Sequence, residues 1–344
     1  MHSSRVELLR LLDTQKRMKA IYIRDFGGPE NLEIRDVPDL QRPVGTEVLI
    51  RVKAAGLNRA DLLQRRGAYP PPPGYSANIP GLEFAGEVAE VADAVTDFKP
   101  GDRVFGITAG EAQAEFLKID HRLLAGIPDN LNFTEAAAVP EAFITAHDAV
   151  FTQGRLKNSE TLLVHAVGSG VGLAALQLGK ANGHRVLGTS RTKEKLERCR
   201  EFGLDDAIVA SEPKFSETVL SKTDGGVDVI LDLVGGAYFE ENLKSLALKG
   251  RMMLVGLTAG STAQINLGMV LSKRATLIGT VLRGRSIAEK AEATRAFSSE
   301  VVPLLADGRV RPNVDRVFDF HDVVAAHRYL ESNESFGKIV LEFE

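Results

Sequence analysis

Hydrophobic and polar positions follow two different rhythms along the chain. From Met18 to about Pro140, short apolar alternations are separated by Gly, Pro and Asp residues. Short strands at such close spacing are typical of a barrel-like β domain. The strand candidates in this part are residues 47–58, 84–93, 101–107 and 111–119, and a further strand opens at Met18.

The rhythm changes between about Glu141 and Ala306, where apolar runs alternate with helix-like segments. Alternating strands and helices predict an α/β fold with a doubly wound, six-stranded parallel sheet. The strand candidates are residues 161–166, 184–190, 206–210, 227–234, 250–257 and 275–282, and the helix candidates include residues 172–182, 193–202 and 238–249.

The end of the chain, residues 317–344, returns to the first texture and finishes in a strand candidate. We expect it to rejoin the N-terminal domain, so that the sheet domain is an insertion. Before that domain, Val6, Leu9 and Leu12 lie at helical spacing, which predicts a packed or frayed helix. The predicted parts are an N-terminal extension (1–17), a β domain (18–140 with 307–344) and a sheet domain (141–306).

Three glycines fall within five residues directly after the first strand candidate of the sheet domain. Gly168, Gly170 and Gly172 have access to backbone conformations closed to other residues and let backbone approach a ligand closely. The following helix offers unpaired N–H groups and a positive dipole end to an anion such as a pyrophosphate. A glycine-rich turn alone also fits tight packing. Because five further strand candidates alternate with helix candidates after it, we predict a dinucleotide site at this turn.

The end of the second strand candidate indicates which dinucleotide is bound. NAD-binding folds usually carry Asp or Glu there for the ribose hydroxyls. Here Ser190 and Arg191 stand at the strand end, followed by Lys193 and Lys195. One interpretation is that these cations are only solvated charges at the start of a helix. However, no carboxylate stands there to repel a 2′-phosphate, and the cations are able to pair with such a phosphate. We therefore predict NADPH in preference to NADH.

Composition and charge indicate which partners, cell location and cysteine chemistry to expect. The 344 residues suffice for two domains, and a net charge of −4 gives no general attraction to nucleic acid or anionic membranes. No apolar run reaches the ~20 residues that span a bilayer, and no secretory signal is visible, so we expect a cytoplasmic protein. The single cysteine, Cys199, excludes an internal disulfide and favours a structural role on a helix. His165 is expected to be a buried partner of backbone groups.

The order of a β domain, a six-stranded nucleotide domain and a returning tail resembles the medium-chain dehydrogenase/reductase superfamily. The segments 56–74 (GLNRADLLQRRGAYPPPPG) and 79–88 (IPGLEFAGEV) are similar to its zeta-crystallin-like quinone oxidoreductase branch, above all to the tumour-suppressor-inducible group. The similarity runs from about Met18 to Glu344. It implies a GroES-like β-barrel domain beside a Rossmann sheet.

The positions that hold zinc in alcohol-oxidising relatives carry other residues here. Leu57 and Asn58 stand where a cysteine is expected, Leu82 beside Glu83 replaces a histidine, and no four-cysteine lobe follows Val104. We therefore expect no metal. Without a Lewis acid, charge that develops on a substrate oxygen must be stabilised by neutral donors, which suits conjugated acceptors such as quinones and enones.

The resemblance assigns catalytic roles to Asn58, Tyr69 and Thr145. The Asn58 amide and the Tyr69 hydroxyl would face the nicotinamide and donate to the substrate oxygen, and Thr145 would contact the nicotinamide end. Structural roles stay open for all three: Asn58 as part of a turn, Tyr69 as a brace for the neighbouring prolines, and Thr145 at a helix start.

The resemblance also implies the remaining cofactor contacts. Residues 169–172 lie under the pyrophosphate, Lys195 meets the 2′-phosphate, and Lys338 reaches the cofactor from the returning tail. One departure weakens the preference for NADPH, because Ala210 and Ser211 stand where many members carry a tyrosine. The predicted cofactor contacts are Asn58, Tyr69, Thr145, Ser169, Gly170, Val171, Gly172, Ser190, Arg191, Lys195, Gly256, Leu257, Thr280, Val281, Leu282 and Lys338.

Together these features predict an NADPH-dependent quinone oxidoreductase that transfers hydride without a metal. Two alternatives stay open: an NADPH-dependent enoyl or 2-alkenal reductase, and a non-catalytic NADPH-binding protein with a structural or sensing role. The expected partner is a small quinone or conjugated carbonyl, with no nucleic acid and no membrane. The sixth strand candidate, residues 275–282, is rich in β-branched residues and would lie at a sheet edge, which predicts a homodimer.

Overall fold

The computed structural model describes residues 17–343, which form two compact units. Unit 1 comprises residues 17–127, 316–334 and 339–343, and unit 2 comprises residues 128–315 and 335–338. The helix predicted around Val6, Leu9 and Leu12 lies outside the described residues. No helix within residues 17–343 is both long enough and apolar enough to cross a lipid bilayer.

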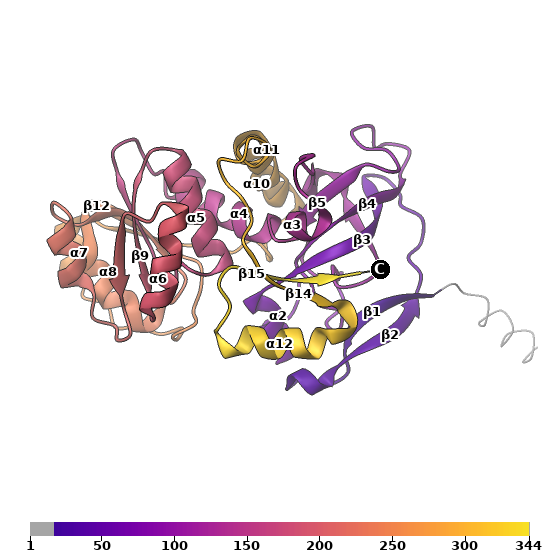
Figure 1. Cartoon of the computed structure of the whole chain (residues 1–344), viewed down its shortest axis with the longest axis horizontal. Helices are drawn as coiled ribbons and strands as arrows, with labels where there is room; N and C mark the ends of the chain where they lie inside the picture. The colour runs from indigo at the N-terminus through magenta and orange to yellow at the C-terminus, as the bar shows by residue number, and fades with distance from the viewer. Residues whose placement is uncertain (1–16, 344) are drawn as a thin grey trace, which may run out of the picture. The chain divides into compact units, whose positions relative to one another are not determined.

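Unit 1 contains a seven-stranded sheet in the order β14-β15-β3-β4-β5-β7, with β6 also paired to β3, and a separate β1–β2 hairpin. The last strand of the chain, β15, pairs antiparallel with the second half of β3. Helix α12 packs near β2 and α2 (Figure 1). The elements are β1 (Arg17–Ile23), β2 (Leu32–Pro38), β3 (Glu47–Leu57), α2 (Arg59–Arg65), β4 (Glu83–Val91), β5 (Arg103–Ile107), β6 (Phe116–Asp120), β7 (Leu124–Gly126), β14 (Val314–Asp319), α12 (Val323–Ser332) and β15 (Lys338–Glu342).

The β3 strand shows why this part of the chain is a sheet. Val48, Ile50 and Val52 are buried, whereas Arg51 between them is exposed. Side chains alternate between the two faces of a strand, so the period-2 pattern places the valines and the isoleucine on the core face. The expected strands at 47–58, 84–93, 101–107 and 111–119 are confirmed as β3, β4, β5 and β6.

Unit 2 is a parallel six-stranded sheet in the order β10-β9-β8-β11-β12-β13. Numbered along the chain, this order is 3-2-1-4-5-6, that of a Rossmann fold. The elements are α3 (Phe133–Ala137), α4 (Pro140–His147), β8 (Thr161–Val164), α5 (Gly170–Ala181), β9 (Arg185–Ser190), α6 (Lys193–Cys199), β10 (Asp206–Val209), α7 (Ser216–Lys222), β11 (Val227–Asp232), α8 (Phe239–Ser245), β12 (Leu246–Leu254), α9 (Leu267–Lys273), β13 (Thr276–Gly279), α10 (Ile287–Glu300) and α11 (Val302–Ala306).

Several helices of unit 2 pack apolar side chains against its sheet. Helices α5 and α6 contact β8, β9 and β10, and a buried cluster joins Phe215, Val219 and Leu243 from the α7–α8 region to the strands (Figure 1). The predicted α/β fold with a doubly wound sheet is confirmed. One boundary was wrong: residues 246–249 belong to β12 rather than to the preceding helix, and Lys249 takes a positive φ of 65° within that strand.

Candidate cofactor and active site

The glycine-rich turn joins β8 to α5 at the carboxyl end of the sheet. Ser169 caps α5, since its hydroxyl oxygen accepts a hydrogen bond from the Gly172 N–H at 3.1 Å. Gly170 and Val171 are the first two residues of α5, and the preceding Ser169 forms a parallel β-bridge with Gly337, so the tail segment lies beside their N–H groups. These two donors lie at the positive end of the helix dipole and fit an anion such as a pyrophosphate.

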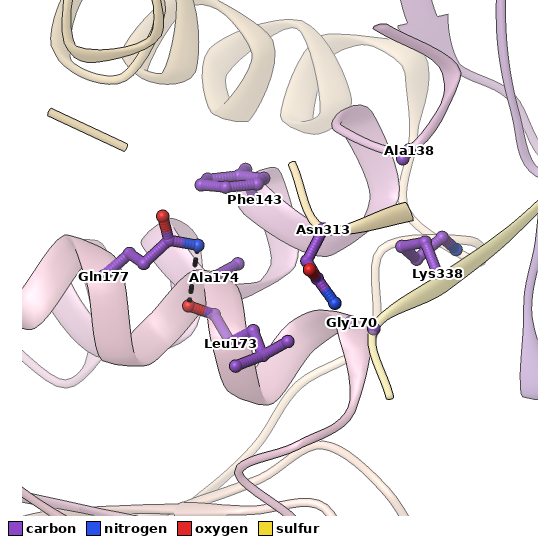
Figure 2. Close-up of a pocket in the computed structure, with 9 residues that line it drawn as sticks. Ala138, Phe143, Gly170, Leu173, Ala174, Gln177, Asn313 and Lys338 are labelled. Atoms are coloured by element: carbon purple, nitrogen blue, oxygen red, sulfur yellow. Dashed lines mark hydrogen bonds between the residues drawn. The ribbon is translucent and has the colours of Figure 1, made fainter. Parts of the chain in front are cut away.

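The glycines of this turn are also required by packing. A Cβ on Gly172 would come within 2.5 Å of the Ala166 carbonyl oxygen, and a Cβ on Gly170 within 2.5 Å of Lys338 Cδ. Figure 2 shows Lys338 beside Gly170 in a small pocket that Asn313 and Phe143 also line. Close packing and ligand approach therefore coincide in this turn, because both need bare backbone.

A short segment of the returning tail lies against the turn. The Gly337 N–H donates to the Gly168 carbonyl at 2.9 Å, and Asn313 Nδ2 donates to the Phe336 carbonyl at 2.6 Å. Phe336 is 1% exposed and packs under the Arg198 guanidinium, which lies 3.9 Å from the ring centroid. Lys338 is consequently fixed at the N-terminal end of α5, where its ammonium fits a phosphate.

The predicted 2′-phosphate residues lie at the end of β9. Ser190 is the last residue of the strand, Arg191 is exposed, and Lys195 follows on α6. Lys195 Nζ donates to the Ser335 carbonyl at 2.7 Å, so this cation links α6 to the tail segment.

A tyrosine does reach the neighbouring end of β10, but it comes from another segment than expected. The Tyr238 hydroxyl donates to the Ala210 carbonyl at 3.0 Å. Burial raises the pKa of Tyr238, and the charge of Arg191 opposes that shift. Tyr238 directly precedes α8, so the residues at positions 210–211 gave no sign of it.

The residues predicted for the nicotinamide side follow β12 and β13. The Gly256 N–H donates to the Asp232 carbonyl at 3.1 Å, whereas Leu257 is exposed. Thr280 directly follows β13, and its hydroxyl oxygen accepts from Gln153 Nε2 at 2.8 Å and from Arg285 at 2.6 Å. Of the two residues after Thr280, Val281 is exposed and Leu282 is buried.

Thr145 lies inside α4, five residues after the helix begins at Pro140, and it is 8% exposed. The alternative in which it stabilises a helix start is therefore wrong, because the start of α4 is occupied by Pro140. A buried threonine in mid-helix leaves its hydroxyl for a local carbonyl or for a ligand.

Asn58 and Tyr69 lie in unit 1, on either side of α2. Asn58 is the N-cap of α2: its N–H donates to Asp61 at 2.7 Å, and its Nδ2 donates to Glu83 Oε1 at 2.8 Å. Glu83 and Asp61 are fully buried, so the amide of Asn58 compensates a buried carboxylate. Tyr69 is half-buried in the loop after α2. Asn58 thus has a structural task, and Tyr69 is the stronger candidate for a donor to substrate.

Sequence reasoning missed a buried polar network under the strand ends of unit 2. His165 was expected to contact backbone groups, but its Nδ1 lies 2.8 Å from Thr189 Oγ1 and its Nε2 lies 2.6 Å from Asn242 Oδ1. Asn242 Nδ2 in turn donates to Asp232 at 3.0 Å. All four side chains are at most 1% exposed. No local motif joins them in sequence, so only the sheet order reveals the set.

Two further expectations concern metal and thiol chemistry. Within residues 17–343, no group of three or more His, Cys, Asp and Glu side chains gathers as a metal ligand set. Cys199 is buried on α6, and burial raises its pKa to about 12. A thiol with so high a pKa is unreactive at neutral pH, which confirms the structural role expected for it.

Comparison with known proteins identifies the family. Residues 45–148 match the alcohol dehydrogenase GroES-like domain, and residues 170–299 match the zinc-binding dehydrogenase domain. The chain is 34% identical over 325 residues to a quinone oxidoreductase of Pseudomonas aeruginosa, covering 94% of this chain and 99% of the relative.

Solved structures agree with this relation. A quinone oxidoreductase of Pseudomonas syringae pv. Tomato superposes with a TM-score of 0.85 at 30% identity, over 95% of this chain and 100% of that one. A mycobacterial protein solved as a complex with NADPH gives the same TM-score at 28% identity, with 95% and 100% coverage. With its GroES-like and Rossmann units, the chain belongs to the quinone oxidoreductases of the medium-chain dehydrogenase/reductase superfamily.

Proposed function

We propose that this protein is an NADPH-dependent quinone oxidoreductase that works without a metal. Membership of the family and the Rossmann strand order make a nicotinamide dinucleotide the cofactor. The observation that carries the choice of NADPH is the end of β9, where Ser190 and Arg191 replace the usual acid and Lys195 follows on α6. A 2′-phosphate there meets cations and no strand-end carboxylate.

The chain's own residues bind and orient the cofactor. The N–H groups of Gly170 and Val171 and the ammonium of Lys338 fit the pyrophosphate, and the cations after β9 fit the 2′-phosphate. NADPH, when bound, supplies the hydride. Tyr69 is the proposed donor to the substrate oxygen, with Asn58 holding the start of α2 in place and Thr145 lining the nicotinamide end. No metal ligand takes part.

A conjugated acceptor suits such a site, because a quinone spreads developing charge over its own ring and needs only neutral donors. The 2-alkenal reductase and the non-catalytic NADPH-binding protein remain the competing functions. The proposed location is the cytoplasm, where NADPH is available to the enzyme.

The deciding experiment follows NADPH absorbance with 1,2-naphthoquinone, 1,4-benzoquinone, crotonaldehyde and a simple ketone, with NADH and a chelator as parallel arms. We expect turnover of the quinones that prefers NADPH and is insensitive to the chelator. Tyr69→Phe should lower kcat by about 10²-fold if the hydroxyl stabilises the oxyanion. Turnover of crotonaldehyde alone would move the function to olefin reduction, and NADPH binding without turnover would favour the non-catalytic protein.

A homodimer is proposed through the edge of the unit 2 sheet. β13 is the last strand of the sheet order, and Leu267 and Leu271 before it and Val281 after it are 69%, 77% and 53% exposed. An edge strand flanked by exposed apolar side chains is suited to pair with a second copy. Sedimentation should give a dimer for the native chain and a monomer for Val281→Asp.

A further inference from the structure

Asp232 fixes which atoms donate and which accept in the buried network of Asp232, Asn242, His165 and Thr189. The Asp232 carboxylate accepts from Asn242 Nδ2 and from the N–H groups of Val234 and Gly235 at 2.8 and 2.9 Å. Since a carboxylate only accepts, the amide oxygen of Asn242 must face His165 Nε2, which therefore carries the ring proton. Burial lowers the pKa of His165, and the neutral ring accepts at Nδ1 from the Thr189 hydroxyl.

Both ends of the network lie in segments that border the cofactor site. The Thr189 carbonyl accepts from the Val167 N–H of the glycine-rich turn at 3.0 Å, and Thr189 directly precedes Ser190 and Arg191. The Asp232 carbonyl accepts from the Gly256 N–H at 3.1 Å. The hydrogen-bonded side chains thus connect β9 to β11 through His165, which directly follows β8, and through Asn242 on α8.

Aromatic packing holds the histidine ring in its plane. The Phe215 ring lies 4.9 Å and the Tyr238 ring 5.0 Å from the His165 centroid, and Tyr238 meets it edge-on at 80°. Tyr238 donates to the Ala210 carbonyl, and the Ala210 N–H donates to the Ser190 carbonyl at 2.9 Å. Through Tyr238 and Ala210, the packing around the His165 ring is thus connected to the strand end that carries Ser190.

We propose that His165, through its hydrogen bond with Thr189, is a positioning residue that sets the preference of this protein for NADPH over NADH. His165 is 0% exposed, so we expect it to act through Thr189 rather than by contact with cofactor or substrate. It fixes the end of β9, and thereby the register of Ser190 and Arg191 against the 2′-phosphate. The inference rests on the proposed NADPH function and names a determinant of specificity within it.

The test measures the Kd of NADPH and of NADH by fluorescence titration for the wild type and four variants. Thr189→Val deletes the hydroxyl with little change of shape, and His165→Leu removes both ring contacts. His165→Gln keeps one donor and one acceptor. The matched control is Thr294→Val, because Thr294 is buried on α10 and its hydroxyl has no partner among the described residues.

We expect Thr189→Val and His165→Leu to raise the Kd of NADPH about tenfold, the factor for ~1.4 kcal/mol, and that of NADH less than about twofold. His165→Gln should restore the preference, and Thr294→Val should leave both values unchanged. If His165→Leu does not fold, Thr189→Val decides alone. A purely structural role would lower the melting temperature and change both Kd values by the same factor, which overturns the proposal, as does no change in either.

The outcomes separate this inference from the proposed function. A wild type that prefers NADPH, loses that preference in Thr189→Val and reduces no quinone upholds the positioning role and rejects the quinone activity. A wild type that prefers NADPH in every variant rejects only the role of His165. A wild type without preference rejects both the NADPH assignment and this inference.

Discussion

His165 in unit 2 and His327 in unit 1 are both 0% exposed, and the two histidines are held in opposite ways. In unit 2, both ring nitrogens of His165 have side-chain partners within 2.8 Å. In unit 1, His327 Nδ1 lies 3.3 Å from Arg65 Nη1, and its Nε2 has no partner among the described residues. Arg65 is 1% exposed, donates to the Gly27 carbonyl at 3.0 Å and pairs with Glu331.

The difference shows that partners, not burial, decide what a buried histidine does. His165 donates to Asn242, which donates to the Asp232 carboxylate, and it accepts from Thr189. His327 fills space between α12 and α2 beside a cation, where burial and the charge of Arg65 lower its pKa to about 3. The His165 ring connects neighbouring strands through hydrogen bonds, and the His327 ring stays neutral and resists protonation.

The largest expected effect is on acid stability, and it comes from His327. Its folded pKa of about 3 lies below the ordinary value of 6.5, so the unfolded chain binds the proton more readily between these values. Stability is therefore complete above about pH 6.5 and is lost as pH falls toward 3, by about 3 kcal/mol at pH 4. Urea unfolding at pH 7, 5.5 and 4 should show this loss in the wild type and a smaller one in His327→Leu. Parallel pH profiles for the two proteins would contradict the prediction.

The next effect contrasts the two histidines at neutral pH. Asn242→Leu leaves the His165 ring N–H and one Asp232 oxygen without their partner, which should cost about 2 kcal/mol of unfolding free energy. His327→Leu should cost about 1 kcal/mol at pH 7, because it removes one hydrogen-bond contact, the 3.3 Å contact of Nδ1 with Arg65, while Nε2 has no partner among the described residues. Denaturant unfolding of both variants at pH 7 measures the contrast, and equal losses would show that the network contributes no more than packing.

The smallest effect removes the cation beside His327. Arg65→Met should cost about 1.5 kcal/mol, less than the ~3 kcal/mol or more for a fully buried pair, because Glu331 is partly exposed and regains water. The same change takes away one cause of the low pKa of His327, so the acid loss should become shallower. An acid profile as steep as that of the wild type would show that burial alone lowers the pKa.

Much of the fold follows from periodicity in the sequence. The six strands of unit 2 were predicted because each is a short apolar run between helix-like segments. The β12 boundary failed for a local reason: Leu246 to Lys249 read as a helix continuation, while the structure turns this segment into a strand with Lys249 at positive φ. β2 (Leu32–Pro38) was not among the expected strands, because its charged residues mask the alternation.

The candidate site was predictable only where position in the fold defines it. The glycine-rich turn and the ends of β9, β12 and β13 are placed by the strand order, so the residues predicted there are found there. The network of His165, Asn242 and Asp232 left no trace in local spacing, because Asn242 is 77 residues from His165. Tyr238 was missed for the same reason, since it reaches Ala210 across 28 residues of chain.

The pairing of β15 with β3 has a consequence for how the protein folds during its synthesis. Leu57 in β3 finds its partner Ile339 only after nearly the whole polypeptide has left the ribosome. Contacts of such long sequence separation form late and slowly. The Rossmann unit, almost complete by residue 315, is free to fold during translation, whereas in the β domain residues 54–57 of β3 must wait for β15.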